Sequence, residues 1–328
     1  MSREFAGGFA QSPGGFVQSA GGFVHTTGGF PQTAGGFVQA NGLRLHYKAN
    51  GSGKLMLFLH GFPDFWRCWQ AQLEHFGVDH LAVAPDMRGF NLSDKPQQVE
   101  QYRAKHLVED IAQLARGFGA DKFVLVAHDW GGAVAWSFAL AHPEMLSHLV
   151  IVNAPHPYTF WRELVNNPAQ REASQYMLLL RDPKAERVLS ENGYARLLRM
   201  RFGDASGAAS DEAERAAYLQ AWSQPGALGA SLNYYRASPL YPASAGDAGA
   251  GKLKLKAVDF RVQVPTLILW GEQDRALLPG NLDGIEEVVP QVEVVRVPQA
   301  GHWVMAAKPD LVNAAIRRFI SKVAKGNP

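Results

Sequence analysis

The chain has 328 residues, 47% of them hydrophobic, with 32 basic and 30 acidic residues and a formal net charge of +2. This balance of charge argues against a nucleic-acid partner, and no apolar run reaches the roughly 18 residues that a membrane-spanning helix needs. The single cysteine, Cys68, excludes an internal disulfide. Together with the lack of a secretory signal pattern, it predicts a cytoplasmic protein.

Residues 6–40 are five copies of a seven-residue unit: AGGFAQS, PGGFVQS, AGGFVHT, TGGFPQT and AGGFVQA. Paired glycines disfavour a helix, and prolines in two copies interrupt a strand ladder. We predict a flexible or loosely packed tail over residues 1–35, with self-association through its phenylalanines as the alternative. The last copy runs into a predicted β-hairpin, with strands at 37–40 and 43–47 joined by Asn41-Gly42. The repeat is therefore interpreted as a duplication of this first strand.

After the hairpin, short apolar runs alternate with helical patterns. Strands are predicted at 55–59, 81–84, 123–127, 149–152, 265–271 and 292–297, and helices at 65–76, 105–117 and 133–141. This alternation is typical of an α/β fold, with a mostly parallel sheet, helices on both faces and functional groups at the carboxyl edge of the strands. Over 154–242 the strand pattern gives way to helical, aromatic-rich segments. We interpret these residues as a helical cap inserted into a core formed by 36–153 and 243–328.

The segment VAHDWGG, residues 126–132, runs from a strand end through a sharp turn into a helix. Its central residue, Asp129, has Ala127 two positions before it and Gly131 two positions after it. Small residues at those positions permit the strained turn of a nucleophile elbow. A carboxylate there displaces a leaving group from a saturated carbon and forms an alkyl ester, whereas a serine attacks acyl carbons.

Hydrolysis of such an ester needs a general base, a residue that orients the base, and donors for the oxyanion. Two predicted strands near the C-terminus are followed by Asp274 and His302, which we expect to be the orienting acid and the base. The order nucleophile, acid, histidine is that of the α/β-hydrolase fold. The backbone N–H groups of Phe62 and Trp130 are expected to form the oxyanion hole.

Six motifs resemble those of α/β-hydrolases of the soluble epoxide hydrolase group, and the resemblance covers about residues 36–325. They are HGFP at 60–63, PDMRGFNLSDKP at 85–96, HDWGG at 128–132, NYYR at 233–236, WGEQD at 270–274 and GHW at 301–303. The resemblance implies hydrolysis of a small apolar epoxide by water to a vicinal diol, through an ester on Asp129, with no cofactor or metal. It also implies a substrate pocket lined by Phe62, Trp130 and Trp303.

An opened epoxide leaves as an alkoxide, which needs a proton donor. In epoxide hydrolases of this type, two cap tyrosines face the nucleophile. The resemblance places one at Tyr235, the second tyrosine of NYYR, and the other at Tyr176, in a cap helix ahead of Asp182-Pro183. A buried ring with a satisfied hydroxyl is the alternative interpretation for each.

A haloalkane or haloacetate dehalogenase with the same nucleophile is the main alternative. Fluoroacetate dehalogenases usually have an arginine where this chain has Trp130, and haloalkane dehalogenases often have an asparagine where it has Phe62. Some dehalogenases carry the triad acid after the strand that here ends at Asn153, whose amide cannot do that work. Trp161 and Trp222 leave a halide-binding cap tryptophan open. A non-catalytic binding protein is less favoured, since such proteins usually lose a catalytic residue.

Three further polar residues near the motifs are expected to be structural. His60 and His128 are predicted to hold loop backbone through hydrogen bonds, and Asp64 is predicted to be a surface or loop-capping carboxylate.

Overall fold

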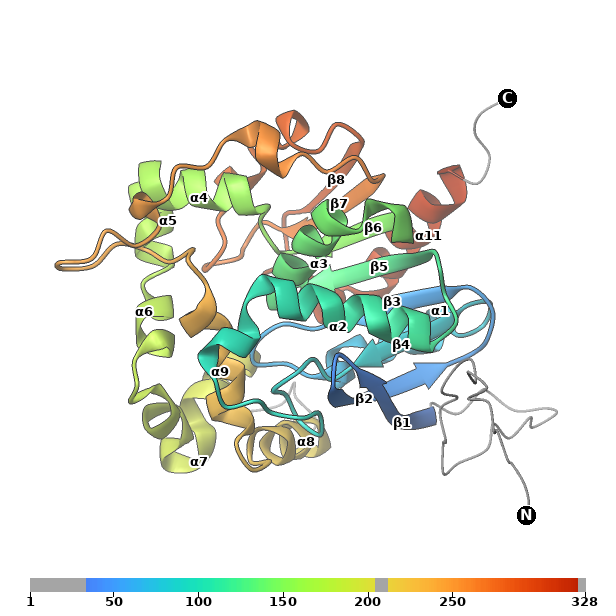
Figure 1. Ribbon diagram of the computed structural model, residues 1–328, viewed down its shortest axis with the longest axis horizontal. Coiled ribbons are helices and arrows are strands. Elements are labelled where there is room, and N and C mark those ends of the chain that lie inside the picture. Colours follow the sequence, from blue (N-terminus) through green and yellow to red (C-terminus); the bar gives the residue numbers. More distant parts are fainter. Residues whose placement is uncertain (1–33, 204–211, 324–328) are drawn as a thin grey trace, which may run out of the picture.

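The computed structural model describes residues 34–203 and 212–323. Strands in these ranges form one eight-stranded sheet in the order β1-β2-β4-β3-β5-β6-β7-β8 (Figure 1). They are β1 (Ala34–Ala40), β2 (Leu43–Asn50), β3 (Leu55–Leu59), β4 (Leu81–Pro85), β5 (Phe123–His128), β6 (Leu146–Val152), β7 (Thr266–Gly271) and β8 (Val292–Val297). From β4 to β8 the neighbours pair in parallel, and β1 and β2 add an antiparallel edge. The predicted fold class is confirmed.

Helices cover both faces of this sheet. They are α1 (Gln70–Phe76), α2 (Ala104–Gly117), α3 (Trp130–Ala141), α10 (Val304–Ala307) and α11 (Pro309–Val323). Successive side chains of a strand point to opposite faces. Accordingly, Leu57 belongs to the apolar layer shared with α2 and α3, whereas Phe58 packs in the layer with α1 and α11. Burial on both faces explains why β3 reads as a continuous apolar run.

The strand pattern is interrupted between β6 and β7. Among the described residues this stretch contains six α-helices, which we call the inserted helices. They are α4 (Pro157–Asn166), α5 (Pro168–Ala173), α6 (Tyr176–Arg181), α7 (Ala185–Phe202), α8 (Glu212–Trp222) and α9 (Ala227–Ala237). Figure 1 shows them gathered on one side of the sheet. None of the helices in the described ranges is long and apolar enough to span a membrane.

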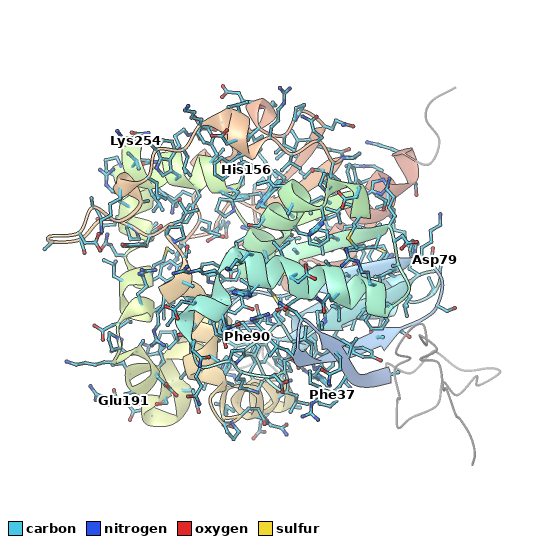
Figure 2. All side chains as sticks on the ribbon, in the orientation of Figure 1. Phe37, Asp79, Phe90, His156, Glu191 and Lys254 are labelled. Atoms are coloured by element: carbon cyan, nitrogen blue, oxygen red, sulfur yellow. The ribbon has the colours of Figure 1, made fainter. Side chains whose placement is uncertain are left out.

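The helix α9 is attached to the loop after β4. The Tyr234 hydroxyl donates a hydrogen bond of 3.0 Å to the Arg88 carbonyl oxygen. Phe90 of the same loop, labelled in Figure 2, packs against α9 and against the loop after β3, with its ring centroid 5.3 Å from that of Tyr234 and 4.7 Å from that of His60. This contact brings α9, which carries Tyr235, next to the loops at the carboxyl edge of the sheet.

The last copy of the repeat forms the whole of strand β1. The strand pairs with β2 through a turn in which Asn41 and Gly42 have φ angles of 52° and 74°, as the predicted hairpin requires. It begins at Ala34, two residues before the expected start of the core at residue 36. Residues 1–33, which make up most of the predicted tail, lie outside the described residues.

Candidate active site

Asp129 occupies the sharp turn between β5 and α3. Its φ and ψ angles of 50° and −119° lie in a region that costs a non-glycine residue on the order of 1–3 kcal/mol. Two glycines allow the close approach of neighbouring loops. A Cβ atom on Gly131 would lie 2.5 Å from the Leu59 carbonyl oxygen, and one on Gly61 would lie 2.3 Å from Asp129 Cβ. The predicted elbow geometry is therefore present.

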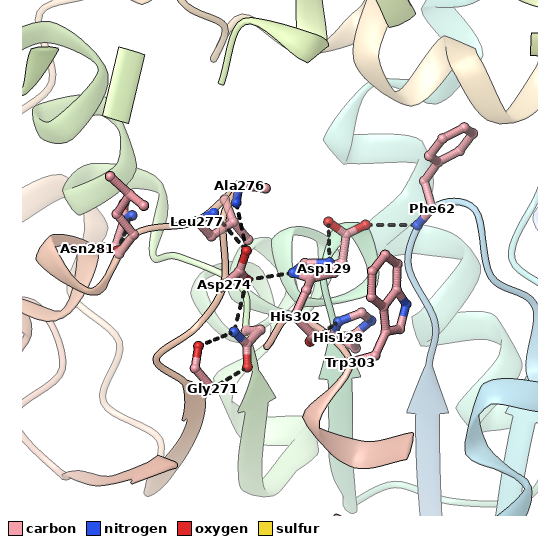
Figure 3. A network of polar contacts seen from close by, with 12 residues as sticks. Phe62, His128, Asp129, Gly271, Asp274, Ala276, Leu277, Asn281, His302 and Trp303 are labelled. Carbon is pink, nitrogen blue, oxygen red and sulfur yellow. Dashed lines mark hydrogen bonds and ion pairs between the residues drawn. The ribbon is translucent and has the colours of Figure 1, made fainter. Parts of the chain in front are cut away.

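Asp129, His302 and Asp274 lie in one row (Figure 3). His302 Nε2 is 3.6 Å from Asp129 Oδ2, and His302 Nδ1 donates a hydrogen bond of 2.6 Å to Asp274 Oδ2. The three residues follow β5, β8 and β7, so they meet at the carboxyl edge where parallel sheets collect functional groups. The contacts between these three side chains are the ones that the predicted roles of nucleophile, base and orienting acid require.

Backbone and side-chain donors hold the Asp274 carboxylate in place. Its Oδ1 accepts the N–H groups of Ala276 and Leu277 at 2.9 and 3.0 Å, and its Oδ2 accepts Asn153 Nδ2 at 2.9 Å. Asn153 also accepts the Gly271 N–H at 2.8 Å, so it bridges the ends of β6 and β7. The sequence analysis excluded Asn153 as the triad acid but did not predict this supporting role. The signal for it was available, because Asn153 is a polar residue at the end of an apolar strand.

The ionisation of this row follows from its geometry. Burial opposes protonation of His302, but the carboxylates of Asp274 and Asp129 outweigh it and raise its pKa to about 10. Burial likewise opposes ionisation of both carboxyl groups, yet the adjacent His302 lowers the pKa of each below its ordinary value. These shifts favour two carboxylates and one imidazolium at neutral pH, the charges in which the three side chains stabilise one another.

The loop after β3 reaches across to Asp129. The Phe62 N–H donates a hydrogen bond of 2.8 Å to Asp129 Oδ1, the oxygen that does not face His302. This is the geometry expected of one oxyanion donor. The contribution of the Trp130 N–H stays a prediction.

The structure brings both candidate tyrosines to this site from the inserted helices. Tyr235 of α9 packs edge-on against Phe62 and Trp130, with ring centroids 5.4 and 5.0 Å apart. Tyr176 of α6 lies next to it, at a centroid distance of 6.3 Å. Burial and the nearby Asp129 carboxylate raise the pKa of both hydroxyls, so both are protonated at neutral pH. Tyr235 thus lies beside Phe62 and Trp130, the two residues expected to form the oxyanion hole, with Tyr176 next to it.

Asp64 is a buried charge, and its prediction as a surface or loop-capping residue was wrong. Asp64 is 1% exposed as a residue, and side chains from two inserted helices, α7 and α8, lie against its carboxylate. The carboxylate accepts Arg201 Nε at 2.7 Å, the Tyr218 hydroxyl at 2.6 Å and Trp303 Nε1 at 2.7 Å. The Trp303 ring also packs edge-on against His302, 4.8 Å between centroids. This contact makes Trp303 a support for the catalytic row, while its predicted place in the pocket wall stays a prediction.

The two flanking histidines hold loop backbone, as expected. His60 Nε2 accepts the Met87 N–H at 3.0 Å. His128 Nε2 donates to the His302 carbonyl oxygen at 3.0 Å, so it fixes the loop that carries His302. Burial and the charge of His302 lower the pKa of His128 to about 4, which keeps it neutral.

Comparison with known proteins agrees with this geometry. Residues 54–309 match the family model described as alpha/beta hydrolase fold. The chain is 36% identical over 293 residues to Epoxide hydrolase 3 of Xenopus tropicalis, covering 86% of this chain and 76% of the relative. It is 35% identical over 289 residues to Epoxide hydrolase 1 of Caenorhabditis elegans, covering 85% and 68%.

A solved structure shows the same similarity in three dimensions. A variant of an epoxide hydrolase from Bacillus megaterium matches with a TM-score of 0.79 at 36% identity, over 87% of this chain and 100% of that one. The similarity thus extends over most of both chains in sequence and in fold. The chain belongs to the α/β-hydrolase family, within its epoxide hydrolase group.

Proposed function

We propose that this enzyme hydrolyses epoxides to vicinal diols in two steps, through a covalent ester on Asp129. The observation that carries the proposal is the position of this carboxylate. One oxygen accepts the Phe62 N–H at 2.8 Å, and the other lies 3.6 Å from His302. In the proposal, residues 154–242 act as a cap that supplies Tyr176 and Tyr235 to a core made of 36–153 and 243–328.

In the first step, an Asp129 oxygen attacks the less hindered or the benzylic carbon of the epoxide and breaks its C–O bond. Tyr176 and Tyr235 hydrogen-bond to the ring oxygen, and one of them donates its proton to the alkoxide that forms. The raised pKa of both hydroxyls keeps this proton in place until the ring opens. The products of the step are a hydroxyalkyl ester on Asp129 and a tyrosinate.

Ester formation also prepares the base for the second step. It removes the negative charge of Asp129, which is one of the causes that keep His302 protonated. The imidazolium then gives its proton, through solvent, to the tyrosinate. Neutral His302, oriented by Asp274, can deprotonate a water molecule.

This water attacks the ester carbonyl carbon of Asp129. The N–H groups of Phe62 and Trp130 stabilise the oxyanion, an interaction whose loss costs about 3 kcal/mol in comparable enzymes. Deprotonation of the water has already returned His302 to its imidazolium form. Collapse of the oxyanion breaks the bond between the Asp129 carbonyl carbon and the diol oxygen, which takes the proton of the new carboxyl group, so the diol leaves and Asp129 is a carboxylate again. Protons and charge therefore balance over the cycle.

The relatives support an epoxide as the substrate. A variant of the epoxide hydrolase from Bacillus megaterium, 36% identical to this chain, has been solved with its product, a naphthyloxy-propane-1,2-diol, which is a vicinal diol with an aromatic substituent. We propose a small apolar epoxide as the substrate of this chain.

A single turnover in water labelled with heavy oxygen tests the ester mechanism. With enzyme in excess over styrene oxide, we expect the label in the Asp129 carboxyl group and not in the diol, because water attacks the ester carbonyl. Label in the diol alone would show that water opens the epoxide directly, and would overturn the proposal.

The same preparation should be assayed for halide release from a bromoalkane and from fluoroacetate. Diol formation without halide is expected from the two tyrosines. Halide without diol would contradict the proposal, since it would make the tyrosines packing residues and favour the dehalogenase alternative.

A further inference from the structure

The two tyrosines of the proposed site come from separate helices, and one arginine joins these helices. Tyr176 is the first residue of α6, and Tyr235 lies in the last turn of α9. Arg181, the last residue of α6, extends its guanidinium group to the carboxyl end of α9. Its Nη1 donates hydrogen bonds to the carbonyl oxygens of Tyr235 and of Ser238, the latter at 2.8 Å.

The guanidinium group is held from a second side by an aromatic ring. The Arg181 Cζ atom lies 3.8 Å from the centroid of the Tyr241 ring, within the range of a cation–π interaction. The last carbonyl groups of a helix lack intrahelical partners and carry partial negative charge, so a cation at this end is favourable. Because one of these carbonyls belongs to Tyr235, a change at Arg181 acts on the backbone of that residue directly.

The spacing of the two tyrosines matters because both hydroxyls have to reach one epoxide oxygen. Misplacement of a reacting group by about 1 Å can cost on the order of a hundredfold in rate. We propose that Arg181 is a positioning residue for epoxide opening, which fixes the spacing of the Tyr176 and Tyr235 hydroxyls by tying α6 to the end of α9. The inference rests on the proposed function, since it presupposes that the tyrosines hold the epoxide oxygen.

Arg236 provides a matched control on the same helices. It donates from α9 to the carbonyl oxygen of Asp182, which directly follows α6, at 3.3 Å, and to Asn233 Oδ1 at 3.0 Å. Like Arg181 it is partly buried. Its contacts therefore join the same two helices without engaging the Tyr235 carbonyl.

The test compares Arg181→Met with Arg236→Met in single turnovers of styrene oxide. Rapid quenching followed by intact-protein mass spectrometry gives the rate constants of ester formation and of ester hydrolysis separately, and thermal melts report stability. We expect Arg181→Met to slow ester formation by about 10- to 100-fold, to leave ester hydrolysis unchanged, and to shift Tm no more than Arg236→Met does. Arg236→Met should form the ester at the wild-type rate.

Arg181→Lys keeps the positive charge without the planar fork, and we expect an intermediate rate of ester formation. It also serves as the measured variant if Arg181→Met does not fold. Three outcomes would each overturn the inference. Arg236→Met could slow ester formation as much as Arg181→Met does, Arg181→Met could slow both half-reactions equally, or the folded Arg181 variants could form the ester at the wild-type rate. Tyr235→Phe separates the two proposals. If it leaves ester formation unchanged, the part of the proposed function that places the epoxide oxygen on Tyr235 fails. If Tyr235→Phe is slow and the Arg181 variants are normal, only the role of Arg181 is refuted.

Discussion

The substitution His302→Gln should separate the two halves of the proposed reaction. The wild-type imidazolium lies 3.6 Å from Asp129 Oδ2, which at an effective dielectric constant of about 20 corresponds to an attraction of roughly 5 kcal/mol. A glutamine removes this attraction and the base together. Ester formation should persist, because the Asp129 carboxylate remains and no longer has to break its ion pair with His302 when it attacks the epoxide. Ester hydrolysis should slow by about 10²- to 10⁴-fold, the usual contribution of a general base.

Intact-protein mass spectrometry after brief exposure to styrene oxide is the direct assay. We expect the variant to gain the mass of one substrate molecule, and peptide mapping to place this mass on Asp129. The double variant with Asp129→Ala is the control, and it should gain no mass. If His302→Gln turns over at the wild-type rate, or if the added mass lies on another residue, the assignment of nucleophile and base is incorrect.

Three other changes test separate parts of the site. Tyr235→Phe should slow ester formation but spare any activity on alkyl halides, and equal loss on both substrates would count against its acid role. The pKa of His302 is raised from 6.5 to about 10, so its ion pairs should stabilise the fold fully below pH 6.5 and lose this effect as the pH rises towards 10. Urea unfolding across this range should show the free energy of unfolding decline. In His302→Gln this decline should be smaller. Arg201→Met should lower the free energy of unfolding by about 3–5 kcal/mol, because it leaves the Asp64 carboxylate buried without its cation. The control is the exposed ion pair of Arg187 with Glu191, in which the Arg187 side chain is 69% exposed. Arg187→Met should change the free energy of unfolding little.

The core of the site could be predicted from the sequence because its signals are local. Asp129, Asp274 and His302 each follow an apolar strand, and the carboxyl ends of parallel strands meet at one edge. The elbow also carries its own signature, because small residues at 127 and 131 are needed at an otherwise strained turn. These features required no knowledge of which distant segments come into contact.

The supporting residues could not be predicted in this way, because their roles depend on contacts between distant segments. Asp64 follows a loop motif and looks exposed in the sequence, yet its partner Arg201 lies 137 positions further on, in an inserted helix. Asn153 contacts Asp274, which lies 121 positions further along the chain, after the neighbouring strand. A local sequence pattern identifies which residue can react. The residues that hold it in place are determined by how the whole chain packs.

The use of the last repeat copy as strand β1 has an evolutionary consequence. The other copies have the same length, and the third, AGGFVHT, has the same apolar pair as β1, AGGFVQA. Gain or loss of whole units upstream of Ala34 would therefore leave the seven residues before Asn41 unchanged, and with them the buried Val38 and the register of the hairpin. The repeat therefore supplies a unit that serves as an edge strand of the sheet, and a change in the number of upstream copies would preserve the sequence of that strand.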